Sequence, residues 1–187
     1  MSIEYAIEVG ARFFSDRGYS ATTTRQLAEA LGITNGTFYH YFASKEDLLR
    51  MICEHSLETM LLEVGDALEA EPKAGKLPAF IRQHMCSVLR QQELHKTMLT
   101  QVDRLGEDNR AKVIALRDQY ETLVRETLEE ARDLRIIRAD IEIRMMTRLL
   151  LNLLNWTIFW FRQDGALTPT AVADLAEKLF MDGARPR

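Results

Sequence analysis

Polar side chains that suit DNA are concentrated between residues 34 and 40. Hydroxyl, amide, phenol and imidazole groups reach base edges or phosphates there without much bulk, and a glycine among them allows the backbone to approach closely. Asparagine can form two hydrogen bonds to the edge of an adenine. The segment therefore favours contacts to both bases and phosphates of DNA. Its polar and flexible residues are Thr34, Asn35, Gly36, Thr37, Tyr39 and His40.

Two short helices joined by a tight turn are expected to present this segment. Thr23 can cap the first helix, with Gln26 as its capping-box partner three residues later. Gly32 ends that helix, where a residue that accepts positive φ is favoured. Thr34 can cap the second helix, which is predicted over residues 35–41. Two helices this short, with a glycine in the turn, are typical of the helix-turn-helix that enters the DNA major groove.

A third helix is predicted to begin at Lys45, after a Ser44 cap, and to run to about Glu69. A helix rises about 1.5 Å per residue, so this one spans more than about 30 Å and is a candidate lever. In the helix before it, Phe38, Tyr41 and Phe42 are expected to pack inward and Tyr39 to face outward.

The run GITNGTFYHYFASKEDL, residues 32–48, closely resembles the N-terminal signature of the TetR family of bacterial transcriptional repressors. Phe13-Phe14 and Gly18-Tyr19 match the apolar first helix and the Gly-aromatic turn that precede that signature. The resemblance implies an all-α fold of about nine helices. It places a three-helix DNA-binding domain with the helix-turn-helix at residues 1–49 and a helical effector-binding and dimerisation domain at residues 50–187.

The same resemblance assigns roles to single residues. Many relatives carry a basic side chain where this chain has Asn35, so the operator sequence is expected to differ from theirs. The phosphate-contact candidates are Thr24, Thr37, Tyr39 and Lys45. The candidates for contacts at or near base edges are Arg25, Asn35 and His40.

A second stretch, NWTIFWFRQDGALTP at residues 155–169, resembles one branch of the TetR family. That branch includes regulators of fatty-acid and steroid catabolism that respond to acyl-CoA thioesters, which makes such a thioester, or a lipid-like molecule, a candidate effector. Plain core packing or subunit contact is the alternative role for each residue of the expected pocket. Those residues are Met60, Phe80, Met85, Met98, Tyr120, Leu123, Trp156 and Trp160.

The most apolar part of the chain starts at Leu149 with LLLNLLNWTIFWF. A membrane-spanning helix needs about 18–20 apolar residues, so this run is too short and no membrane contact is expected. A helix that is apolar on nearly all sides is buried on several sides. Helices at about 141–163 and 169–182 are therefore expected to pair with those of a second copy, as the four-helix interface of a homodimer.

Charge and motifs restrict the function further. The formal net charge is −4, so DNA binding has to depend on local placement of charge, on salt and on dimerisation. No P-loop, GxGxxG, GxSxG or HExxH motif occurs, and the four histidines lack metal-ligand spacing, so an enzyme, a cofactor and a metal site are not expected. The N-terminus has no signal-peptide pattern, which favours a cytoplasmic protein.

The sequence as a whole predicts a repressor that binds a palindromic operator as a dimer. A small apolar effector is expected to shift the 45–69 helix and release the DNA. Two alternatives remain: a helical protein–protein interaction module with a non-functional helix-turn-helix, and an enzyme site hidden in the apolar C-terminal part.

Overall fold

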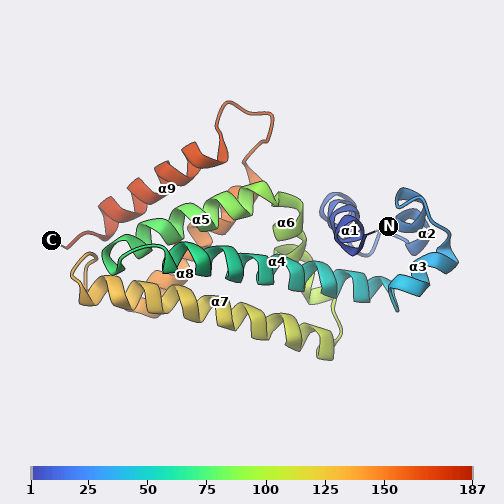
Figure 1. The fold of residues 1–187 in the computed structure, drawn as a ribbon, viewed down its shortest axis with the longest axis horizontal. Coiled ribbons are helices and arrows are strands. Elements are labelled where there is room, and N and C mark those ends of the chain that lie inside the picture. The colour runs from blue at the N-terminus through green and yellow to red at the C-terminus, as the bar shows by residue number, and fades with distance from the viewer. Residues whose placement is uncertain (1, 187) are drawn as a thin grey trace. The chain divides into compact units, whose positions relative to one another are not determined.

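The computed structural model describes residues 2–186; Met1 and Arg187, the outermost residues of the two predicted domains, lie outside the described part. Helices joined by turns make up this part of the chain, which contains no strand (Figure 1). The all-α prediction is therefore confirmed. The α-helices are α1 (Ile3–Arg17), α2 (Thr24–Ala30), α3 (Asn35–Tyr41), α4 (Lys45–Glu69), α5 (Lys76–Arg90), α6 (Gln92–Gln101), α7 (Glu107–Asp133), α8 (Ile143–Asn155) and α9 (Pro169–Ala184).

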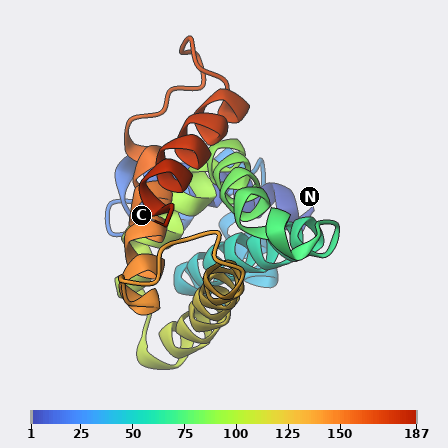
Figure 2. The same ribbon diagram turned by 90° about the vertical axis from the view of Figure 1, so that its left-hand side faces the viewer.

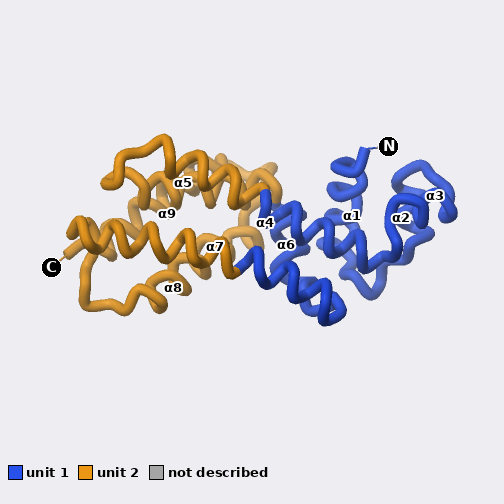
Figure 3. The backbone as a smooth tube through the Cα atoms, turned by 60° about the horizontal axis from the view of Figure 1, so that its bottom comes forward, with its two compact units in different colours: residues 1–58, 92–117 blue, residues 59–91, 118–187 orange. Residues whose placement is uncertain are grey.

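The helices form two compact units, coloured separately in Figure 3. Unit 1 consists of residues 1–58 and 92–117, and unit 2 of residues 59–91 and 118–187. The predicted DNA-binding domain, residues 1–49, falls within unit 1. Because α4 and α7 each contribute residues to both units, neither unit is one continuous segment of sequence.

Unit 1 is organised around a hydrophobic core to which α1 to α4, α6 and the start of α7 all contribute. Phe14, Phe38 and Phe42 are fully buried in it, and α1 packs against α6. Burying apolar surface stabilises a fold by roughly 25 cal/mol per Å², so these large rings fix the positions of the short α2 and α3.

The local signals read from the sequence are present in the structure. Thr23 and Gln26 form the capping box of α2, with the Thr23 Oγ1 accepting from the Gln26 amide. Gly32 has a φ of +70° in the turn that follows. The Thr34 hydroxyl accepts from the Thr37 amide at 3.0 Å and caps α3. Ser44 accepts from the Asp47 amide at 3.0 Å at the start of α4.

Unit 2 consists mainly of α5, α8 and α9 together with the adjoining parts of α4 and α7. Helix α5 packs along α9 and also contacts α8. Figure 2 shows α9, in red, lying along α5, in green. None of the helices in the described part of the chain is long and apolar enough to span a membrane.

The predicted helix over residues 141–163 is wrong in extent. α8 covers Ile143–Asn155 only, and a 3-10 helix follows at Trp156–Phe159. The Thr157 hydroxyl donates to the Leu154 carbonyl at 2.6 Å, and the Phe161 amide donates to the Thr157 carbonyl at 2.9 Å. These bonds tighten and then end the helical turn, as is common at helix C-termini.

Candidate DNA-binding surface and effector site

Helix α3 exposes on one side the polar residues selected from the sequence. The Tyr39 side chain is 51% exposed, and its hydroxyl lies 3.4 Å from the Thr24 hydroxyl of α2. α2 and α3 thus share one polar surface. Its exposed members are Arg25, Thr34, Asn35, Gly36, Tyr39 and His40, and its half-buried members are Thr24 and Thr37.

The opposite side of α3 packs inward. Phe38 and Phe42 are fully buried, with ring centroids 5.1 Å apart. Tyr41 was predicted to pack with them, but its side chain is 40% exposed. Phe38 and Phe42 are four residues apart and share one face, whereas the Tyr41 ring packs edge-on against His40.

Lys45, a predicted phosphate contact, also forms hydrogen bonds inside the protein. Its Nζ donates to the Tyr19 carbonyl at 2.8 Å and to the Thr22 carbonyl at 2.7 Å. The same Nζ lies 4.1 Å from the centre of the Tyr19 ring. Partial burial lowers the pKa of this ammonium. Because an ammonium has three N–H donors, one is left that can bind a phosphate.

Helix α6 and the turn before α7 form hydrogen bonds to α1 and to the start of α4 within unit 1. The Thr97 hydroxyl donates to the Ala11 carbonyl of α1 at 2.9 Å. The Gly106 amide donates at 3.0 Å to the Glu46 carboxylate of α4, which also accepts from Asn109 at 2.7 Å. These bonds hold α1 and the start of α4 against segments some sixty or more residues further along the chain.

An apolar groove of about 350 Å³ lies between the end of α8 and α9 in unit 2. Trp156 is 67% exposed and Trp160 53%, although both are large hydrophobic side chains. A soluble monomer rarely exposes so many large apolar groups together, and such a patch marks an interaction site. The exposed lining residues are Leu153, Trp156, Trp160, Leu167, Leu175 and Leu179.

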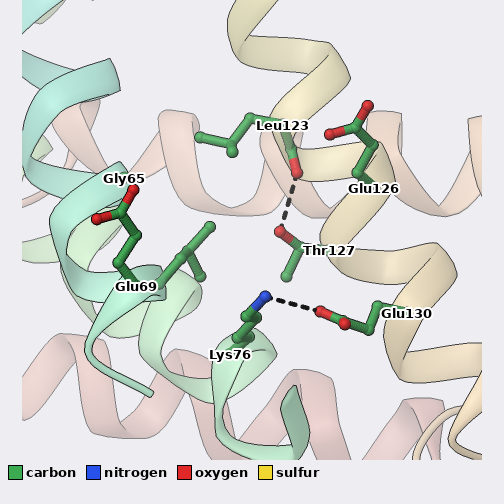
Figure 4. Close-up of a pocket in the computed structure, with 8 residues that line it drawn as sticks. Gly65, Glu69, Lys76, Leu123, Glu126, Thr127 and Glu130 are labelled. Carbon is green, nitrogen blue, oxygen red and sulfur yellow. Dashed lines mark hydrogen bonds and ion pairs between the residues drawn. The ribbon is translucent and has the colours of Figure 1, made fainter. Parts of the chain in front are cut away.

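A second cavity, of about 400 Å³, lies between α4, the start of α5 and α7 (Figure 4). The rim of this cavity is charged. The Lys76 ammonium pairs there with the Glu130 carboxylate at 3.0 Å, and Glu69 and Glu126 add two further carboxylates. Its apolar lining comes mainly from Leu68 and Leu123.

A buried chain of hydrogen bonds joins α5, α7 and α8 in unit 2. The His84 Nδ1 lies 2.7 Å from the Tyr120 hydroxyl, and its Nε2 lies 3.2 Å from the Asn155 Oδ1. Burial lowers the pKa of His84 to about 4, and burial raises the pKa of Tyr120. Both rings are therefore neutral at pH 7.

The eight residues expected to line an effector pocket lie in different places. Tyr120 and Phe80 are buried beside His84, and Leu123 lines the cavity next to α4. Trp156, Trp160 and Met85 line the α8–α9 groove instead. Met60, a buried α4 residue, belongs to unit 2, whereas Met98 lies in the core of unit 1 and is not brought together with the others.

His84 was missed as a candidate, although one signal was present. Phe80, His84 and Val88 are spaced four residues apart, so a titratable ring stands on the apolar stripe of α5. A polar residue in such a stripe needs a buried hydrogen-bonding partner.

The neutral His84 makes stability depend on pH. The unfolded chain takes up a proton near pH 6.5, whereas the folded state does not do so until about pH 4. The His84 contribution is therefore complete above pH 6.5 and is lost as the pH falls to 4. We expect the free energy of unfolding to drop by about 3 kcal/mol across that window.

Urea unfolding between pH 4 and 7.5 measures this loss. The variant His84→Gln should lack most of the pH slope, whatever its stability at pH 7.5, whereas His55→Gln should keep it. An equal slope in the wild type and His84→Gln would contradict the assignment of a neutral buried ring.

Comparison with known proteins identifies two matching regions. Residues 6–52 match the family described as bacterial regulatory proteins, tetR family, and residues 70–184 match the family described as tetracyclin repressor-like, C-terminal domain. The first match contains the α2–α3 surface, and the second contains the α8–α9 groove.

Relatives match over nearly the whole chain. The HTH-type transcriptional repressor KstR2 of Mycobacterium tuberculosis is 26% identical over 89% of this chain and 84% of its own length. The structure of the TetR family transcriptional regulator PfmR from Thermus thermophilus is 32% identical, with a TM-score of 0.87, over 95% of this chain and 97% of that one. AibR, solved in complex with isovaleryl coenzyme A and operator DNA, shares the fold at 24% identity and a TM-score of 0.86, over 95% and 96% of the two chains.

Both family descriptions refer to regulators or repressors, and KstR2 and PfmR are named as transcriptional regulators and not as enzymes. The expectations of a regulator fold with an N-terminal helix-turn-helix and of a non-enzymatic role are confirmed. The chain belongs to the TetR family of bacterial transcriptional regulators.

Proposed function

We propose that two copies of this chain bind a palindromic operator in double-stranded DNA and repress transcription until a small effector binds unit 2. The α3 helix of each copy enters the major groove, and the two grooves lie about one helical turn, roughly 34 Å, apart. Because it acts on the chromosome, the protein works in the bacterial cytoplasm.

The two-sided character of α3 is the observation that carries the proposal. The fully buried Phe38 and Phe42 hold the helix to unit 1, and the exposed Asn35, Tyr39 and His40 leave its other side free for DNA. The residues assigned to DNA are Thr24, Arg25, Thr34, Asn35, Gly36, Thr37, Tyr39, His40 and Lys45. KstR2 is itself named a repressor, which supports this use of the surface.

The α8–α9 groove is proposed as the contact between the two copies. Its exposed tryptophans and leucines are the large apolar groups that subunit interfaces cover. A symmetric pairing of α8 and α9 with the same helices of a second copy buries them and sets the separation of the two α3 helices.

Unit 2 is proposed as the effector-binding part of the chain. Its α4–α7 cavity and the buried groups around Tyr120 offer an apolar site with a few polar atoms, as small-molecule sites do. The class includes acyl-CoA thioesters, because AibR was solved with isovaleryl coenzyme A and operator DNA. The effector releases DNA only if its affinity differs between the operator-bound and free forms.

Selection of bound sequences from random DNA, followed by fluorescence anisotropy at several salt concentrations, tests the proposal. We expect a palindrome to be enriched and Tyr39→Ala to weaken operator binding by about tenfold, because a groove or phosphate contact is worth roughly 1–3 kcal/mol. Tyr5→Ala is the matched control, since Tyr5 is 48% exposed on α1, close to the 51% of Tyr39.

No enrichment by a folded dimer at low salt would contradict the repressor and favour a protein-binding helical module. The α2–α3 surface has few basic side chains, and its exposed permanent cation is Arg25. This low basic content favours the protein-binding alternative.

A further inference from the structure

Two rows of side chains face each other along the seam between α5 and α7. Lys76, Phe80 and His84 recur every four residues on α5. At one end the Lys76 ammonium pairs with Glu130, and at the other His84 bonds to Tyr120 at 2.7 Å. Since α5 rises about 1.5 Å per residue, roughly 12 Å separate the two ends. The seam thus runs from a charged rim to a buried polar end.

The outer part of this seam is open. The cavity of about 400 Å³ in Figure 4 has its α5 wall at Lys76 and extends along α7 from Glu130 to Leu123. Leu123 is three residues from Tyr120, so the two side chains are neighbours on one helix face. A ligand that fills the cavity and extends past Leu123 therefore approaches the buried polar end.

The inner end has a defined hydrogen-bonding polarity. The Asn155 Oδ1 can only accept, so His84 donates from Nε2. A neutral imidazole then has a bare Nδ1, so the Tyr120 hydroxyl donates its one proton to it. After this bond is made, the Tyr120 oxygen still has a lone pair that can accept one hydrogen bond. Phe80, with its ring centroid 6.4 Å from that of Tyr120, supplies an aromatic wall beside it.

The stability of the fold alone does not require the hydrogen bonds between His84, Tyr120 and Asn155. Even when all its groups are hydrogen-bonded, a buried polar network stabilises a fold only about as well as apolar packing does. We therefore expect the network in the proposed effector-binding unit to have a further role. A site built to receive a hydrogen bond rejects analogues that lack the donor, because its own polar group is then left unpaired.

We propose that the α5–α7 seam is the effector site and that it selects an elongated apolar molecule whose inner end carries a hydrogen-bond donor, a hydroxyl or an amide N–H, directed at the Tyr120 oxygen. This deepens the proposed function and rests on the assignment of effector binding to unit 2. The charged rim, where Lys76 pairs with Glu130 and where Glu69 and Glu126 also line the cavity, contacts the outer, solvent-facing end of the ligand.

Two probes of nearly equal shape test the selection. 4-Pentylphenol carries a hydroxyl donor, and 4-pentylanisole replaces that donor with a methyl ether. Isothermal titration calorimetry on the full chain should give about fivefold tighter binding of the phenol, because one neutral hydrogen bond is worth roughly 1 kcal/mol. Tyr120→Phe should bring the ratio to about one, whereas Tyr5→Phe, which removes the hydroxyl of an exposed tyrosine on α1, should leave it unchanged.

A wild-type measurement guards against a folding defect in Tyr120→Phe. Nitrogen NMR of the His84 ring should shift on addition of the phenol and not of the ether. Equal affinities for the two probes, no binding of either, or an unchanged ratio in Tyr120→Phe would each overturn the proposal. Operator binding is measured separately by anisotropy, so failure of the seam and failure of the repressor are distinguishable.

Discussion

Replacing Leu175 and Leu179 together by glutamate is expected to give a folded monomer that has lost operator binding. The two side chains are 59% and 66% exposed in the single chain, so unit 2 tolerates glutamate at both positions. In a dimer the same change forces four carboxylates into an apolar contact, at a cost of several kcal/mol for each buried unpaired charge. Operator affinity should fall on the order of 100-fold or more, because each monomer presents one α3 helix and the advantage of bivalent binding is lost.

Light scattering coupled to size-exclusion chromatography measures the subunit state, and circular dichroism confirms that the helices are retained. The matched control is Leu62→Glu on α4, because Leu62 is also 66% exposed but does not line the α8–α9 groove. It should remain dimeric and bind the operator. A double variant that elutes as a dimer would rule out this groove as the subunit contact.

Signals that act within a few residues were predictable from the sequence. The Thr23–Gln26 capping box and the Thr34 cap each join groups three residues apart, so residue types at that spacing specify the bond. Gly32 likewise has the positive φ that its place in the turn indicated. These features position the α2–α3 surface, which is why its candidate residues could be selected without a structure.

Features that depend on distant partners could not be predicted in the same way. The apolar run after Leu149 indicated one long helix, yet α8 ends at Asn155. The Thr157 hydroxyl that follows donates to the Leu154 carbonyl and lies 3.3 Å from the Met85 sulfur of α5. Met98 has the apolar character of a pocket residue but lies in the core of unit 1. Apolar periodicity tells which face of a helix is covered, but not which neighbour covers it.

The role of Lys45 combines both kinds of information. The resemblance of its sequence neighbourhood to the TetR signature implied a phosphate contact, whereas its bonds to the Tyr19 and Thr22 carbonyls connect groups more than twenty residues apart. A purely DNA-contacting lysine and a lysine that also holds the fold together differ in what their removal does. This difference can be measured.

Lys45→Met is expected to lower both the stability of the protein and its affinity for DNA. The change leaves two part-buried carbonyls without their charged donor and removes the cation from the Tyr19 ring. A hydrogen bond to a charged group is worth roughly 1.5–3 kcal/mol and a surface cation–π contact about 0.5–1 kcal/mol. With allowance for the partial exposure of Lys45, the expected loss is about 3 kcal/mol, or about 8 °C in the melting temperature.

Arg25→Met separates the two roles, because Arg25 is exposed on α2 and is assigned to DNA alone. It should weaken operator binding and reduce the salt dependence of that binding by about one ion, while leaving the melting temperature nearly unchanged. Differential scanning calorimetry and anisotropy on both variants give the comparison. If Lys45→Met melted with the wild type and lost only DNA affinity, the two carbonyl bonds would contribute little to stability. The Lys45 ammonium would then act mainly on the phosphate backbone, and the fold of unit 1 would depend on its buried rings.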